Sequence, residues 1–210
     1  MDLYLRFHRF GRSTFMGHLD WIREVQSILL RTDLKLKYKG EFSPKMKLSF
    51  SPPLPMGAES EAEYVYISLL KYTPVKEVVR EVSRQLPGGV MLMEVGQGQK
   101  DRHTKEMVEY EFVFRGEDAD RVENAIEDLW KGEPTEKVSE LFNEVSAQLE
   151  RAEGMDLVDA QDGIVLKIFS PHDERTIFRS GKFIGGLVQL LELKGYPRVY
   201  KRAISADIST

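Results

Sequence analysis

The chain has 210 residues, of which 41% are hydrophobic and 30% are charged, a composition typical of a globular protein. That length allows one large domain or two small domains of about 100 residues each. No apolar run approaches the roughly 20 residues that a membrane helix needs, and residues 1–10 lack the apolar core of a secretory signal. With no cysteine, the chain has no disulfide, no thiolate metal site and no cysteine nucleophile. We therefore expect a cytoplasmic protein without a membrane segment, a bound metal or a cofactor.

The formal net charge of −4 conceals an uneven distribution along the chain. Residues 1–57 carry ten lysines and arginines against five acidic residues, whereas residues 58–160 carry twelve against twenty-four. Residues 161–210 are again mildly basic, with eight against five. A local basic surface can attract a polyanion even on an acidic protein. The alternative is that these charges form ordinary solvated faces.

The first 97 residues follow the order strand, helix, strand, strand, helix, strand. The strand patterns lie at residues 2–10, 34–37, 64–70 and 90–95, and the helix patterns at 18–32 and 75–86. The first helix carries an apolar stripe of Leu19, Ile22, Val25, Ile28 and Leu29. Thr73-Pro74 is a typical start for the second helix, whose inward side chains are predicted to be Val75, Val78, Val79 and Val82. This order is that of a ferredoxin-like, or split βαβ, unit.

The second half repeats the scheme after a polar, glycine-containing linker at residues 98–106. Strands are predicted at 107–114, 156–160, 163–169 and 199–206, and helices at 117–130 and 183–194. A further apolar helical pattern near 135–150 indicates an inserted helix. The sequence thus predicts an α+β protein of two tandem ferredoxin-like (βαββαβ) units, at 1–97 and 107–210, the second with an extra helix.

Residues 39–64 combine more local constraints than any other stretch of the chain. Four prolines fix the backbone there, and Gly40 and Gly57 allow turns. Period-two alternation places Lys45, Lys47 and Ser49 on one face and the apolar Met46, Leu48 and Phe50 on the other. Alternate lysines on one face of an extended segment suit a phosphate backbone. The alternative is that they protect an edge strand from aggregation.

Other side chains with chemical potential are scattered along the chain. His18 is a candidate general acid or base or phosphate ligand, although His18 and Asp20 at the start of a helix could also act only as caps. Glu59, Glu61 and Glu63 could bind Mg²⁺, but salt bridges or a solvated face suit three glutamates better. Arg198, Lys201 and Arg202 form a basic end to the chain. Exposed aromatic side chains could stack on bases, although core packing is their commoner fate; the aromatic candidates are Tyr4, Phe7, Phe15, Phe42 and Phe50.

A set of short motifs stands in order along the first third of the chain: residues 17–20 (Gly-His-Leu-Asp), Arg31, residues 40–50, residues 54–60 and Glu63-Tyr64. Together they resemble a bacterial radical-SAM-linked family of unknown function (DUF2344), and the similarity is close over residues 3–70. Gly17 stands where the family usually has serine, Ser43-Pro44 replaces Asn-Pro, and the acidic residues 150–154 replace a basic stretch. The resemblance implies an accessory or substrate-binding role beside a radical SAM protein and a connection with RNA. It implies no established activity, and the cysteine-free chain lacks the CxxxCxxC motif of the radical SAM catalyst itself.

The leading hypothesis is a non-catalytic accessory module that binds RNA or a phosphate-bearing substrate for a radical SAM enzyme. The predicted binding residues are His18, Asp20, Arg31, Lys45, Lys47, Ser49 and Glu59. One alternative is a metal-independent endoribonuclease that uses His18 with Lys45 or Lys47, an expectation by analogy of fold. Another is an adaptor whose acidic middle docks a basic protein.

Overall fold

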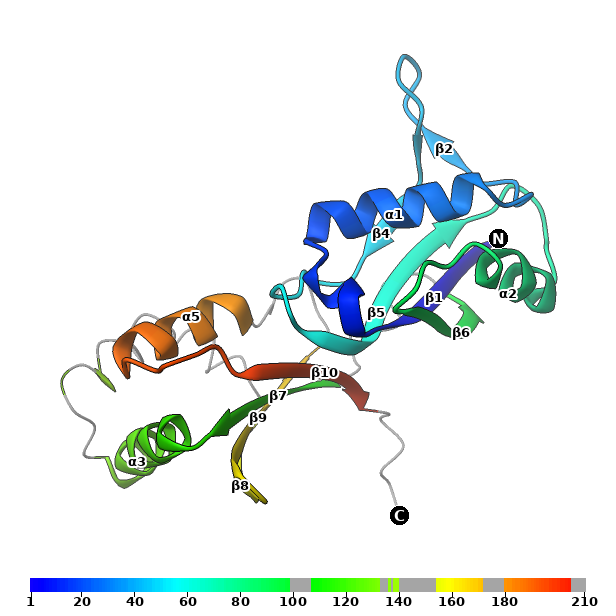
Figure 1. Ribbon diagram of the computed structural model, residues 1–210. Helices are drawn as coiled ribbons and strands as arrows, with labels where there is room; N and C mark the ends of the chain where they lie inside the picture. Colours follow the sequence, from blue (N-terminus) through cyan, green and yellow to red (C-terminus); the bar gives the residue numbers. More distant parts are fainter. Residues whose placement is uncertain (99–106, 133–135, 137, 140–153, 172–179, 205–210) are drawn as a thin grey trace. The chain divides into compact units, whose positions relative to one another are not determined.

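A computed structural model describes residues 1–98, 107–132, 136, 138–139, 154–171 and 180–204 (Figure 1). The chain divides into two compact units, Met1–Lys105 and Glu106–Thr210, and each is described by itself. The described residues contain four α-helices and mainly antiparallel strands, so the prediction of an α+β protein is confirmed. The predicted linker at 98–106, except Gly98, and most of the predicted helix at 135–150 lie outside the described residues.

In unit 1 the strands β6, β1, β5 and β4 lie side by side in that order, and every neighbouring pair is antiparallel. Two further short strands, β2 and β3, pair only with each other. The bounds of the unit 1 elements are β1 Asp2–Arg9, the 3-10 helix η1 Gly11–Phe15, α1 His18–Leu30, β2 Tyr38–Lys39, β3 Lys45–Met46, β4 Leu48–Phe50, β5 Glu59–Ser68, α2 Val75–Ser83 and β6 Val90–Gln97.

The core of unit 1 lies between this sheet and the two helices α1 and α2. Leu3, Leu5 and Phe7 alternate along β1 and are all buried, as the sequence predicts. They share one core with buried side chains of both helices, namely Trp21, Val25, Ile28, Leu29, Val78 and Val82. The predicted helix faces need correction at two exposed residues. Leu19 is exposed because the buried stripe of α1 passes through Trp21 instead, and Val79 is exposed because α2 buries Val78 and Val82.

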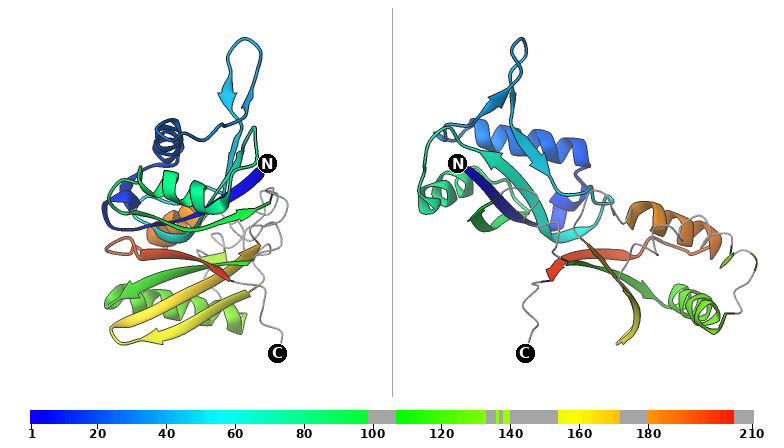
Figure 2. Two further views of the ribbon diagram at one scale, coloured as in Figure 1. Left: turned by 90° about the vertical axis from the view of Figure 1, so that its right-hand side faces the viewer. Right: turned by 180° about the vertical axis from the view of Figure 1, so that it is seen from behind.

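The segment after α1 differs from its predicted structure. Residues 34–37 form no strand of their own; Leu36 makes an isolated bridge with Leu69, and the Lys37 N–H donates to the Ser68 carbonyl oxygen at 2.8 Å. The chain instead makes the β2–β3 hairpin, then β4, and β5 already begins at Glu59 rather than at Tyr64. This hairpin projects from unit 1 in every view (Figures 1 and 2).

Unit 2 shows the same succession of strands and helices among its described residues. Its elements are β7 Met107–Arg115, α3 Glu117–Lys131, β8 Gly154–Ala160, β9 Gly163–Pro171, α5 Ser180–Leu190 and β10 Arg198–Ile204. The strands lie in the order β10, β7, β9, β8, again antiparallel. Helix α5 packs on the sheet through Phe183, whose ring centroid lies 5.7 Å from that of Phe112. None of the helices described in the structure is long and apolar enough to span a membrane.

Candidate functional site

The β2–β3 hairpin gathers four lysines on one of its faces. Its register pairs Tyr38 with Met46 and Lys39 with Lys45. The backbone N–H of Lys47 donates to the carbonyl oxygen of Lys37 at 2.9 Å, which extends the pairing by one step. Because side chains two residues apart share a face of a strand, Lys37 and Lys39 lie on the same face as Lys45 and Lys47. We call these four residues the lysine face.

The lysine face carries uncompensated charge. No carboxylate among the described residues forms an ion pair with any of its four lysines. Between residues 37 and 47 the only acidic residue is Glu41, which lies in the turn. Like charges placed directly opposite each other across a strand pair destabilise the pairing. An anion bound between them would remove that repulsion.

A cavity of about 340 Å³ begins at the base of the hairpin. Lys39 and Lys47 contribute to its lining together with Ser49, whose partner on β5 is Tyr66. The cavity also contains Asp2, which accepts a hydrogen bond from the Ser68 hydroxyl at 2.6 Å. The lining thus combines two lysines and two serine hydroxyls with one already hydrogen-bonded carboxylate and the apolar Leu48 and Ile67.

The sequence correctly assigned the two faces of the segment that follows the hairpin. Met46, Leu48 and Phe50 pack against the hydrophobic core, and Lys47 and Ser49 line the cavity, which Leu48 also touches. The opposite strand of the hairpin escaped sequence reasoning, so Lys37 and Lys39 were missed. A signal was available, because Gly40 and Pro44 bracket a turn between two short lysine-containing stretches.

His18 and Asp20 do not join the lysine face. His18 is the first residue of α1, and its ring packs edge-on against Phe50 with 6.4 Å between centroids. Phe50 points to the core side of β4, whereas Lys47 and Ser49 point to the opposite side. Asp20 pairs with Arg23 at 3.0 Å, and neither predicted capping residue provides a side-chain cap, because Gly17 occupies the N-cap position. The described residues therefore do not assemble the histidine–lysine pair of the endoribonuclease hypothesis.

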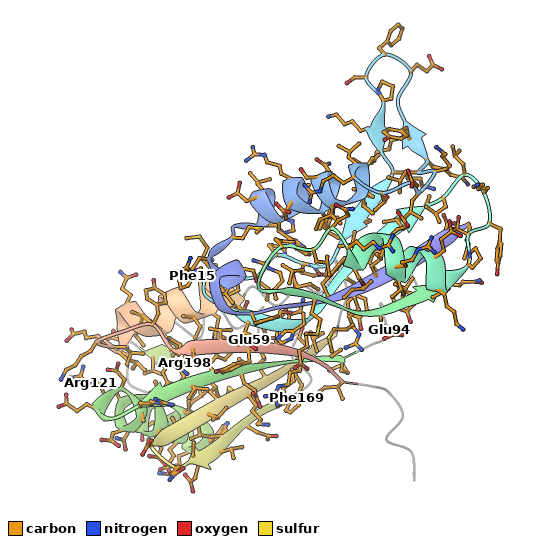
Figure 3. The ribbon with its side chains drawn as sticks, turned by 45° about the vertical axis from the view of Figure 1, so that its right-hand side comes forward. Phe15, Glu59, Glu94, Arg121, Phe169 and Arg198 are labelled. Carbon is orange, nitrogen blue, oxygen red and sulfur yellow. The ribbon has the colours of Figure 1, made fainter. Side chains whose placement is uncertain are left out.

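Arg31 and Glu59 also have other partners. Arg31 ends α1, donates to the Gln85 carbonyl oxygen at 3.2 Å and lies 3.7 Å from a Glu24 carboxylate oxygen. The Glu59 carboxylate lies 2.9 Å from His8 Nε2, and Figure 3 shows Glu59 well away from the projecting hairpin. The salt bridges of Glu59 and Glu63 in the described structure are thus made with His8 and Arg9 and not with the lysine face. The described residues also contain no group of three acidic or histidine side chains that could hold a metal ion.

A buried ion pair that the sequence patterns do not predict accounts for the burial of two motif residues, Ser60 and Glu63. Arg9 and Glu63 have side chains only 3% and 2% exposed, with Arg9 Nη1 3.8 Å from Glu63 Oε2. Arg9 Nη2 donates to the carbonyl oxygens of Ser13 and Met16, at 2.8 and 2.7 Å, just before α1 begins. The Ser60 hydroxyl donates to Glu63 at 3.1 Å. Burial lowers the pKa of Arg9, and the neighbouring Glu63 carboxylate partly opposes that effect.

The fold and the site thus define an α+β protein with a basic hairpin and, at its base, a cavity to which two of the hairpin lysines contribute. A family model described as "Uncharacterized protein conserved in bacteria (DUF2344)" matches residues 3–165, which is most of the chain, and the chain belongs to this family. The match includes the whole hairpin and extends into β9 of unit 2, well beyond residues 3–70. No curated protein gives a significant match.

Proposed function

We propose that this protein is a non-catalytic binding module that holds RNA or a phosphate-bearing substrate at the lysine face. The observation that carries the proposal is the pairing of Lys39 with Lys45, beside Lys37 and Lys47, without a carboxylate partner among the described residues. Lysine provides a mobile, strongly hydrated point charge, which suits phosphate contacts without base specificity. Lys47 and Ser49 at the cavity would hold one phosphate, and the outer lysines would contact its neighbours.

We further infer that both units are ferredoxin-like, at residues 1–97 and 107–210, with 98–106 as their linker. The spatial strand orders β6-β1-β5-β4 and β10-β7-β9-β8 support this inference. If the four strands of each sheet are numbered along the chain, their spatial order is 4-1-3-2 in both units, which is the order of a split βαβ arrangement. The radical SAM partner and the cytoplasmic location rest on the family resemblance and the composition, and recovery of a radical SAM protein with the tagged chain would test the partnership.

A salt-dependent binding titration tests the proposed function. Purified protein is titrated into labelled total tRNA and into a mixed single-stranded RNA pool at a series of salt concentrations. Up to four phosphate contacts predict a log–log slope of about −3 for single strands. The double variant Lys45→Glu and Lys47→Glu should lose most of that slope and most of the affinity.

A charge-matched variant controls for the overall change of four charge units. Lys76→Glu with Lys182→Glu alters two exposed helical lysines outside the hairpin and should bind nearly as the wild type does. If both double variants weaken binding equally, the interaction depends on overall charge and the assignment to the lysine face is wrong. If the wild-type protein binds neither RNA at any salt concentration, RNA is not its ligand.

A further inference from the structure

The turn of the β2–β3 hairpin presents an aromatic side chain entirely to solvent. Phe42 is fully exposed (101%) in the turn that joins the two lysine-bearing strands. We propose that the ligand of this hairpin is single-stranded RNA and that Phe42 stacks on one of its bases while the lysine face contacts the flanking phosphates. This inference rests on the proposed function and specifies its substrate class.

The backbone of the turn holds Phe42 away from the body of the protein. Gly40 has φ +95°, and a Cβ atom there would lie 2.9 Å from the carbonyl oxygen of Ser43. Glycine is therefore required at this position, and Pro44 fixes φ on the other side of the turn. A turn restricted in this way loses less conformational entropy when Phe42 meets a ligand.

The combination of groups distinguishes a single strand from other polyanions. Lysines alone contact the phosphates of duplexes and single strands alike, because backbone contacts carry little information about the bases. An aromatic ring beside them can stack only on a base that is already unpaired, which is how proteins that bind single strands without sequence preference combine charge with stacking. Phe42 extends beyond the lysine face, so one ribbon provides both kinds of contact.

A membrane surface is the strongest competing partner for a basic hairpin with an exposed aromatic tip. Membrane-surface binding requires a large apolar face buried among the lipids. Here the five turn residues, 40–44, include a single large apolar side chain, Phe42, together with the charged Glu41. Charge and stacking therefore favour RNA, and anionic vesicles serve as a test of the alternative.

The test compares Phe42→Ala with the wild-type protein by fluorescence anisotropy. The probes are a labelled, unstructured 12-nucleotide RNA, a blunt RNA duplex of the same length, and vesicles of phosphatidylserine and phosphatidylcholine. Phe42→Ala should weaken single-strand binding at least fivefold, in line with the usual contribution of one stacked base, and should leave duplex affinity and the salt slope unchanged. Tyr72→Ala, which removes another exposed aromatic ring of unit 1, should change neither.

A second variant gives a direct signature of stacking. Phe42→Trp should retain single-strand affinity, and its added tryptophan emission should be quenched by the single strand more than by the duplex. The buried Trp21 and the exposed Trp130 give the background, which the wild-type protein measures.

The possible failures are distinguishable. If Phe42→Ala binds the single strand as tightly as the wild type while Lys45→Glu with Lys47→Glu does not bind, the lysine face stands and base stacking is refuted. If the wild type binds vesicles in a manner that depends on Phe42 and binds no RNA, the tip is a membrane contact and both proposals fail. If Phe42→Ala weakens single-strand and duplex binding equally, the substitution has disturbed the hairpin itself. That result would refute base stacking as the cause of the lost affinity.

Discussion

Replacing Glu63 with glutamine tests the importance of the buried ion pair in unit 1. The change keeps the shape of the side chain and one acceptor for the Ser60 hydroxyl, but it removes the charge that faces Arg9. Arg9 cannot respond by releasing its proton near neutral pH, even though burial lowers its pKa, because a guanidinium remains protonated in proteins. The variant therefore contains a buried cation without a counter-charge.

The structure sets the size of the expected loss. Two unit charges about 4 Å apart interact by about 4 kcal/mol at an effective dielectric constant of about 20, and removing one partner of a buried pair typically costs about 3–5 kcal/mol. In Glu63→Gln, Arg9 keeps its two backbone acceptors and its position 5.1 Å from the ring centroid of Trp21. We therefore expect the lower end, about 3 kcal/mol, which lowers the melting temperature by roughly 12–24 °C for a domain of about 100 residues.

Urea denaturation, followed by the fluorescence of the buried Trp21, measures this loss. Glu61→Gln is the matched control, because Glu61 lies on the same strand with an exposed side chain, and its variant should stay within about 0.5 kcal/mol of the wild type. A loss below about 1 kcal/mol in Glu63→Gln would refute the argument. Such a result would mean that the backbone acceptors of Arg9 satisfy its charge without Glu63.

Two further predictions concern the core of unit 1 and the charge network of unit 2. Leu29→Ala should lower the free energy of unfolding by about 2–5 kcal/mol, because Leu29 is only 2% exposed. Leu30 is 64% exposed, so Leu30→Ala should change that free energy by at most about 0.5 kcal/mol. Equal losses for the two variants in urea denaturation would contradict the observed helix face. The hydrogen bond from Lys167 to Glu109, at 2.6 Å, raises the pKa of that lysine. Its stabilising contribution is then complete below the unfolded-state pKa of about 10.4 and is lost as pH rises through the higher folded-state value. Denaturation curves between pH 9 and 11.5 should show a steeper loss of stability in the wild type than in Lys167→Met, and parallel profiles would contradict this.

Local patterns in the sequence predict the parts of this protein that depend on neighbouring residues. The alternation in residues 2–10 gives β1 its buried face, and the alternation in residues 45–50 separates the cavity side from the core side of β4. The period of two is a property of any extended chain, so no tertiary information is needed for these assignments. Helix α1 shows where such reasoning stops, because Leu19 and Trp21 are both apolar and only the direction of packing buries Trp21.

The site combines a local hairpin with a cavity that distant strands build. The sequence alone marks Lys45, Lys47 and Ser49 as a polar face, with the correct chemistry for an anion. The turn at residues 40–44 sets the register that places Lys39 opposite Lys45, whereas the cavity requires β4 to pair with β5, which the packing of the whole unit decides.

The partners of the charged motif residues are likewise decided by the fold. Glu59 and Glu63 follow the lysines closely in sequence, yet they contact His8 and Arg9, because β5 lies antiparallel beside β1. Glu63 is buried and belongs to the core of unit 1, whereas Lys39, Lys45 and Lys47 are exposed. Composition and alternation thus determined which residue types this protein offers to a ligand. The pairing of strands that are distant in the sequence decided which of these residues meet, because such contacts form only when the intervening loops close and the whole sheet assembles.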